Sequence, residues 1–130
     1  MPEPSPEHDR VAREVVHSAY AVHTALGPGL LESVYERCLA HELGLRGLTV
    51  AAQVALPVAY KGVQMDAGFR IDLLVEKLIV VEVKAVETAL PIHQAQLLTY
   101  LRLSGFQLGL LINFNVRLLK NGIHRLVASV

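Results

Sequence analysis

Two largely apolar segments, 71–75 and 78–83, separated only by Glu76-Lys77, restrict the fold of this chain more than any other feature. Both are rich in Val, Ile and Leu, and such runs are typical of strands that are covered on both faces. Alternation along a strand places Glu82 and Lys84 on one face and only apolar side chains on the other. The sequence therefore predicts a sheet between two layers, with two charges projecting from a buried strand.

The register of this hairpin decides what Asp72 faces. If the loop centres on Lys77, residues whose numbers sum to 154 stand opposite one another, so Asp72 lies across from Glu82 (72 + 82). Two carboxylates with Cβ atoms roughly 5 Å apart repel each other, unless a divalent cation or a shared proton lies between them. The alternative is a buried ion cluster of Asp72, Glu82 and Lys84. A register change of one residue would turn Asp72 to the opposite face.

Hydrophobic periodicity and turn signals predict the other elements. The expected helices cover residues 6–26, 31–44 and 91–103, and the expected strands cover residues 50–60, 69–75, 78–84, 108–114 and 123–127. The first three strands form an antiparallel meander whose first turn is at Lys61-Gly62. A second turn signal, Asn121-Gly122, precedes the last strand. The order ααβββαββ predicts an α/β fold, a mixed β-sheet flanked by helices. We expect residues 1–5 to be a flexible N-terminus and residues 6–130 to form a single domain.

Composition narrows the choice of partner. The chain carries 12 Lys+Arg against 12 Asp+Glu, which excludes a strongly basic nucleic-acid coat protein, so that any nucleic-acid contact is local. Its residues are 52% hydrophobic and only 18% charged, whereas about a quarter of the residues in an average soluble protein are charged. The apolar excess favours a dense core or a homo-oligomer.

Cys38 is the single cysteine, so neither an intramolecular disulfide nor a cysteine-ligated zinc site can form. We expect it to be a buried small hydrophobe. The Pro-rich, acidic N-terminus is unlike a signal peptide, and no apolar run approaches the roughly 20 residues of a membrane helix. These features predict a cytoplasmic protein without a membrane segment.

Two motifs carry a family resemblance. Asp72, a short hairpin and Glu82-Val83-Lys84 form the pattern of the PD-(D/E)XK nuclease superfamily, and residues 29–35 match the Gly-x-x-Glu-x-x-Tyr signature of its GxxExxY family. The match continues at residues 72–75, 82–85, 93–101 and 110–114. The chain therefore resembles the GxxExxY proteins over nearly its whole length, although Ile71 replaces the proline of the superfamily's name.

The resemblance implies a restriction-endonuclease-like core and a role for each matched residue. Asp72 and Glu82 resemble metal-binding carboxylates, with the Val83 backbone carbonyl as a further ligand of Mg²⁺ or Mn²⁺. Lys84 resembles the lysine that orients the attacking water. Glu32 resembles the acidic residue that the superfamily has on its first helix.

Four further residues are expected to support the site: Gly29, Tyr35, Gln96 and Tyr100. Each assignment of a side chain has a structural alternative. Glu32, in the first turn of its helix, is also favoured by the helix dipole. Both tyrosines fit core residues that make one hydrogen bond better than site residues. Gln96 can equally cap a backbone group. His93 shares the edge of Gln96 and Tyr100, but a role at the start of its helix fits it better.

The predicted function is Mg²⁺-dependent hydrolysis of phosphodiester bonds in nucleic acid, DNA rather than RNA, by a homodimer or a component of a larger complex. The alternative is a catalytically silent module that keeps the nuclease fold for interaction or dimerisation. The complete set of Asp72, Glu82 and Lys84 favours chemistry. The lack of a basic track in the sequence favours the module.

Overall fold

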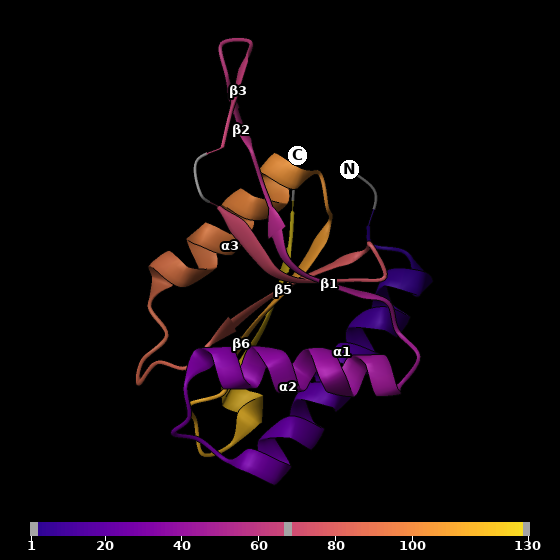
Figure 1. Cartoon of the computed structure of the whole chain (residues 1–130), viewed down its shortest axis with the longest axis vertical. Helices are drawn as coiled ribbons and strands as arrows, with labels where there is room; N and C mark the ends of the chain where they lie inside the picture. Colours follow the sequence, from indigo (N-terminus) through magenta and orange to yellow (C-terminus); the bar gives the residue numbers. More distant parts are fainter. Residues whose placement is uncertain (1–2, 67–68, 129–130) are drawn as a thin grey trace.

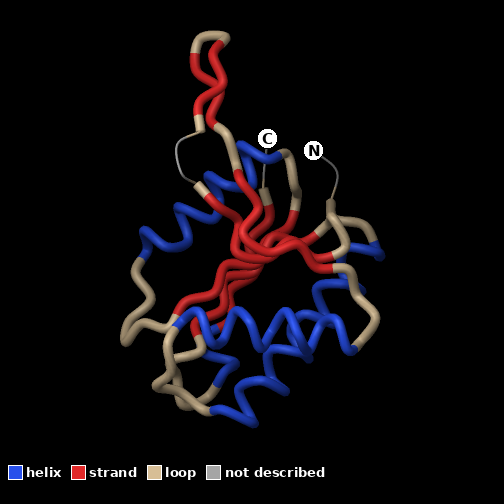
Figure 2. The backbone as a smooth tube through the Cα atoms, in the orientation of Figure 1, coloured by secondary structure: helices blue, strands red, loops and turns tan. Residues whose placement is uncertain are grey.

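A computed structural model of the protein describes residues 3–66 and 69–128 and contains a five-stranded mixed sheet between two helical layers (Figures 1 and 2). The helices are α1 (Pro6–Leu26), α2 (Glu32–Leu45), α3 (Pro91–Ser104) and the short 3-10 helix η1 (Leu119–Gly122). The strands are β1 (Val50–Ala55), β2 (Val58–Tyr60), β3 (Val63–Met65), β4 (Arg70–Val75), β5 (Ile79–Lys84), β6 (Leu108–Asn113) and β7 (Ile123–Val127).

The sheet has the order β1-β4-β5-β6-β7 and is covered on both faces. Only β5 and β6 pair in parallel, because α3 connects them across one face. Val81 and Val83 lie in a core with α1 and α2, whereas Val80, on the opposite face of β5, lies in a second core with α3. The predicted α/β fold, a mixed sheet flanked by helices, is confirmed.

The helix bounds follow local signals in the sequence. The Ser5 hydroxyl accepts a hydrogen bond from the backbone N–H of His8, which caps the start of α1 at Pro6. Ser5 is thus fixed at the helix start, while residues 1–2 of the predicted flexible N-terminus lie outside the described residues. The first helix matches its predicted bounds, and α3 ends at Ser104, one residue beyond the predicted end and directly before the predicted stop, Gly105. The second helix continues through Gly44 to Leu45, so Gly44 is not its stop.

The predicted strand 50–60 is wrong as a single element. It is divided at Leu56-Pro57 into β1 and β2, because Pro57 has no N–H to donate to a ladder. An unpredicted strand, β3, pairs with β2, and the two form a hairpin that projects beyond the sheet (Figure 1). We call residues 58–65 the arm. Its turn is the predicted Lys61-Gly62, where both residues adopt positive φ.

Gly29 and Tyr35, two of the four predicted supporting residues, shape the loop between α1 and α2. Gly29 has a φ of +101°, a conformation that favours glycine. The buried Tyr35 ring stacks on Phe114 at a centroid distance of 4.7 Å, and its hydroxyl donates to the Gly27 carbonyl and accepts from the Leu30 N–H. Tyr35 is therefore a core residue, as its structural alternative predicts.

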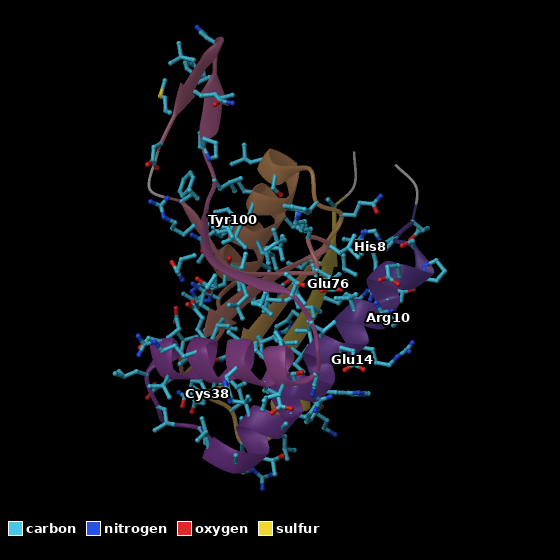
Figure 3. All side chains as sticks on the ribbon, turned by 45° about the vertical axis from the view of Figure 1, so that its right-hand side comes forward. His8, Arg10, Glu14, Cys38, Glu76 and Tyr100 are labelled. Atoms are coloured by element: carbon cyan, nitrogen blue, oxygen red, sulfur yellow. The ribbon has the colours of Figure 1, made fainter. Side chains whose placement is uncertain are left out.

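The expectation of a buried Cys38 is wrong. Its side chain is half-buried on α2 (Figure 3), beside an apolar groove between α1 and α2. Among the described residues, no helix is both long enough and apolar enough to cross a membrane.

Candidate active site

The site begins at a kink in β4. The predicted register is confirmed at three pairs, including Leu73 with Val81, each with numbers that sum to 154. Residues two apart in a regular strand share a face, yet Leu73 lies in the core under α1 and α2 while Ile71 lies in the core under α3. The strand therefore turns over at Asp72, and the described ladder with β5 ends there.

Side chains of Asp72 and Glu82 replace the ladder beyond this point. The Val83 N–H donates to Asp72 Oδ2 at 2.9 Å, and the Asp72 N–H donates to Glu82 Oε1 at 3.3 Å. Each side-chain carboxyl oxygen thus accepts a hydrogen bond from a backbone N–H that would donate to a backbone carbonyl in a regular strand pair. The two acids are brought together, as predicted, but through side chains in the gap between the strands rather than as a regular cross-strand pair.

Glu82 carries the strongest electrostatic perturbation of the site. It is only 5% exposed. Burial, then the negative charge of Asp72, raises the pKa of Glu82 to about 8, while the Asp72 N–H and the Lys84 ammonium oppose the rise. Without a cation, this carboxyl is therefore largely protonated at neutral pH. A group with its pKa displaced in this way is typical of functional sites.

Two residues that the sequence did not indicate, Glu36 and Gln53, complete the acidic cluster. Gln53 Nε2 donates to both carboxylate oxygens of Glu36, at 2.9 and 3.0 Å, and lies 3.4 Å from Asp72 Oδ1. Burial raises the pKa of Glu36 and Asp72 adds to the rise, whereas the bond from Gln53 opposes it. Glu36 is thus the helical acid that reaches Asp72.

The predicted helical acid, Glu32, lies one turn before Glu36, at the exposed start of α2. Its charge contributes to the raised pKa of Glu36, but no hydrogen bond joins it to the other acids within the described part of the chain. The i, i+4 spacing places both glutamates on one helical edge. This spacing was the sequence signal by which Glu36 could have been identified as a second acid of the site.

Gln53 has an unusual backbone. It lies between Ala52 and Val54, which pair with Leu73 and Ile71, so it stands opposite Asp72 at the kink. Its φ of +53° is uncommon for a residue other than glycine. Left-handed residues of this kind are concentrated at functional sites, where the surrounding structure maintains the strain.

Lys84 is half-buried on β5, two residues beyond Glu82. The strand is fixed there by pairing with β6 and by the Phe114 N–H, which donates to the Lys84 carbonyl at 2.9 Å. Among the residues that the structure describes, no ion pair joins Lys84 to either carboxylate. The predicted alternative of a closed Asp–Lys–Glu ion cluster is therefore not the observed arrangement.

Tyr100 and Gln96 flank the acids from α3. Gln96 Nε2 donates to the Tyr100 hydroxyl at 3.1 Å, and the centroids of the Tyr100 and Phe69 rings are 5.7 Å apart. Figure 3 places Tyr100 between α3 and the sheet. Burial raises the pKa of Tyr100, and the charges of Glu82 and Asp72 raise it further, so its hydroxyl remains protonated near them. His93 accepts from the Leu90 N–H at the start of α3, the role that fits a helix end.

The donor set fits a hydrated divalent cation. Mg²⁺ uses one or two protein carboxylates and completes its shell with water and phosphate oxygens. Asp72 and Glu82 provide two adjacent carboxyl groups, and a cation would replace the proton that Glu82 keeps in its absence. Across residues 3–66 and 69–128, no three His, Cys, Asp or Glu side chains are arranged to hold a metal ion. The two carboxylates of Asp72 and Glu82 match the one or two protein carboxylates that Mg²⁺ uses.

Comparison with known proteins gives one finding. A family model described as the PD-(D/E)XK nuclease superfamily matches residues 9–126. Searches of curated proteins and of solved structures returned no match. The matched region extends from α1 into β7 and contains all the acids of the cluster together with Lys84.

Proposed function

Because the chain belongs to the PD-(D/E)XK nuclease superfamily, we propose that it is a Mg²⁺- or Mn²⁺-dependent nuclease that hydrolyses phosphodiester bonds, with DNA as the preferred substrate. Nucleases of this superfamily generally depend on divalent metals. The signature at residues 29–35 supports the narrower assignment to the GxxExxY proteins. The apolar composition, 52% hydrophobic, supports a homodimer or a place in a larger complex.

One observation carries the proposal. The side chains of Asp72 and Glu82 each accept a hydrogen bond from the backbone of the other's strand, and Lys84 is the next residue on the same face of β5. Placing two acidic side chains together, with one of them buried, lowers the free energy of unfolding. A structural ion cluster would recover that cost by pairing the acids with Lys84, and this pairing is not made. Without a cation, the proton that Glu82 keeps removes part of the cost, and affinity for a cation that replaces this proton would account for the two adjacent acids.

The roles of the residues follow from their positions. Asp72 and Glu82 would hold the cation, and the Val83 carbonyl is available on the same side as its N–H, toward the gap in which Asp72 lies. When bound, the cation would stabilise charge on the scissile phosphate and acidify the attacking water. Lys84 is within reach of Glu82 and would orient that water. Gln53 positions Glu36 beside Asp72, and Tyr100 would donate a hydrogen bond at the rim.

The test is cleavage by the wild type and by Lys84→Ala, with Mg²⁺ or Mn²⁺, of supercoiled, linear and single-stranded DNA and of RNA. Removing one preorganised polar group from an active site costs about a hundredfold or more in rate, so we expect Lys84→Ala to lose activity by that factor. Lys77→Ala is the matched control, since Lys77 is an exposed lysine in the turn at the other end of the same hairpin.

Equal activity of the wild type and Lys84→Ala would remove Lys84 from the mechanism. No cleavage of any substrate with either metal would favour the catalytically silent module. Faster cleavage of RNA than of DNA would correct the substrate class. Sedimentation of the wild type tests the homodimer independently of cleavage.

A further inference from the structure

The arm displays an apolar face to solvent. Its register pairs Val58 with Met65 and Tyr60 with Val63, and the alternation of strands places these four side chains together on one face. Tyr60 is 59% exposed, Val63 56% and Met65 45%. We call these four residues the arm face.

The opposite face of the arm is turned toward the domain. Ala59 and Gln64, which pair between the two apolar pairs, line the pocket between the base of the arm, the sheet and the end of α3. The arm face lines no part of that pocket. This arrangement reverses the usual pattern, in which a hairpin turns its apolar face to its own core. Since an isolated two-stranded hairpin is only marginally stable, the exposed face indicates a partner.

The arm is joined to the candidate active site by both of its strands. The chain enters it from β1, which carries Gln53, and leaves it toward β4, which carries Asp72 (Figure 1). A nucleic acid with a phosphate beside Asp72 would therefore lie near the base of the arm. At the tip, Lys61 Nζ lies 5.4 Å from the centroid of the Tyr60 ring, so that a cation and an aromatic face occur together.

We propose, on the basis of the proposed nuclease function, that the arm face stacks against unpaired bases of the substrate, with Tyr60 as the principal stacking residue. Phosphate recognition needs cations and base-edge recognition needs hydrogen-bonding groups, whereas the arm face offers apolar surface. The faces of bases are open to such a surface only where the bases are unstacked or single-stranded. The preferred substrate therefore has unpaired bases next to the cleaved phosphate.

A second copy of the chain is a weaker candidate for the occupant. A stable protein interface uses about 20–30 residues on each side, and the arm face has four. A nucleic acid that is already held at the active site needs only a small additional contact. Stacking on one aromatic side chain supplies a contact of that size without regard to base identity.

The experiment compares Tyr60→Ala, Tyr60→Phe and the wild type on two substrates of the same sequence, a fully paired duplex and a duplex with a short single-stranded gap. We expect Tyr60→Ala to lower kcat/KM on the gapped substrate about tenfold and on the duplex less than twofold. Tyr60→Phe keeps the ring and stays within twofold of the wild type on both. Because Tyr60 is exposed, thermal unfolding should be unchanged.

A second measurement does not depend on cleavage. A single-stranded oligonucleotide that contains 2-aminopurine reports stacking by fluorescence quenching, which we expect with the wild type and Tyr60→Phe and not with Tyr60→Ala. Quenching without cleavage by the wild type would support the arm and overturn the nuclease proposal. Cleavage that is equal for all three proteins on both substrates, or no binding of any nucleic acid, would overturn the arm proposal. Dissociation of a wild-type dimer by Tyr60→Ala would assign the arm face to a second copy instead.

Discussion

Gln53 has a strained backbone and a side-chain amide that contacts two acids, and replacing it by glycine should affect protein stability and metal affinity differently. Its φ of +53° is strained for a residue with a side chain, and its amide joins Glu36 to Asp72. Replacement by glycine relieves the strain, which is of the order of 1 kcal/mol, and removes the amide. We therefore expect Gln53→Gly to unfold no more easily than the wild type but to lose about tenfold in Mn²⁺ affinity, measured by titration calorimetry.

Lys77→Gly is the control for this prediction. Lys77 has a nearly equal φ, +55°, in the exposed turn between β4 and β5, remote from the acids. It should gain stability from the same relief of strain while its Mn²⁺ affinity stays that of the wild type. If Gln53→Gly keeps full affinity, Gln53 does not position the acids.

Glu82 makes the stability of the metal-free protein depend on pH. Between the ordinary value of 4.5 and the folded pKa of about 8, the folded protein keeps a proton that the unfolded chain has released. The free energy of unfolding therefore falls as the pH rises through this range, by up to about 1.4 kcal/mol per pH unit. Glu82→Gln, which has no proton to lose, should remove most of that slope.

Urea denaturation in EDTA at pH 5, 6.5 and 8 measures this effect. Equal slopes for the wild type and Glu82→Gln would assign the pH dependence to other groups. Adding Mg²⁺ or Mn²⁺ at pH 8 should restore stability to the wild type, because ligands that bind only the folded state stabilise it.

At the scale of elements, the hairpin of β4 and β5 was predictable because its turn is short. A tight turn fixes the register, so the pairing of Leu73 with Val81 followed from centring the loop on Lys77. The division of strand 50–60 was not predicted, since its three valines and Tyr60 favour a strand, although Pro57, which cannot donate to a ladder, marks the break. The arm depends on that division.

The incomplete prediction of the site has a different cause. Asp72, Glu82 and Lys84 lie on one hairpin, where alternation alone relates them. Glu36 and Gln53 come from α2 and β1, and they reach Asp72 through the packing of α2 and the left-handed backbone of Gln53 opposite the kink in β4. The i, i+4 spacing relates Glu36 to Glu32 on one edge of α2, but no local pattern shows which of the two lies beside Asp72, and the role predicted for Glu32 stays a prediction.

The junction between η1 and β7 depends on a glycine. A Cβ at Gly122 would lie 2.2 Å from the carbonyl oxygen of Asn113. The buried Asn113 side chain binds both backbone groups of Val86, in the segment that follows β5. Because backbone rather than a flexible side chain must move, we expect Gly122→Ala to lower the free energy of unfolding by about 2 kcal/mol or more.

Chemical denaturation measures this cost, and Gly44→Ala is the control. Gly44 lies within α2, where an added Cβ meets no atom within 4 Å. Alanine there should stabilise the helix by roughly 0.5–1 kcal/mol. Equal stability of Gly122→Ala and the wild type would show that the η1–β7 junction relaxes freely.

At the scale of the whole molecule, the charges balance and are widely paired. The 12 cationic residues match 12 acidic ones. Among the residues that the structure describes, four arginines form ion pairs with nearby acids: Arg10 with Glu7, Arg46 with Glu14 and Glu42, Arg70 with Asp66, and Arg125 with Asp9. Substrate binding must therefore come from local contacts at the active site and the arm rather than from a broad positive surface.

This distribution sets the salt dependence of binding. The logarithm of the binding constant falls with the logarithm of salt concentration by about 0.7 to 0.9 for each phosphate contacted. Lys61 and Lys84 are the lysines of the arm and the site, so we expect a slope shallower than about −3, measured by fluorescence anisotropy between 50 and 200 mM salt. Lys77→Ala, at the far end of the hairpin, should leave the slope unchanged. A slope steeper than about −5 would require a basic groove that one copy of this chain does not supply, and would mean that a partner completes the nucleic-acid site.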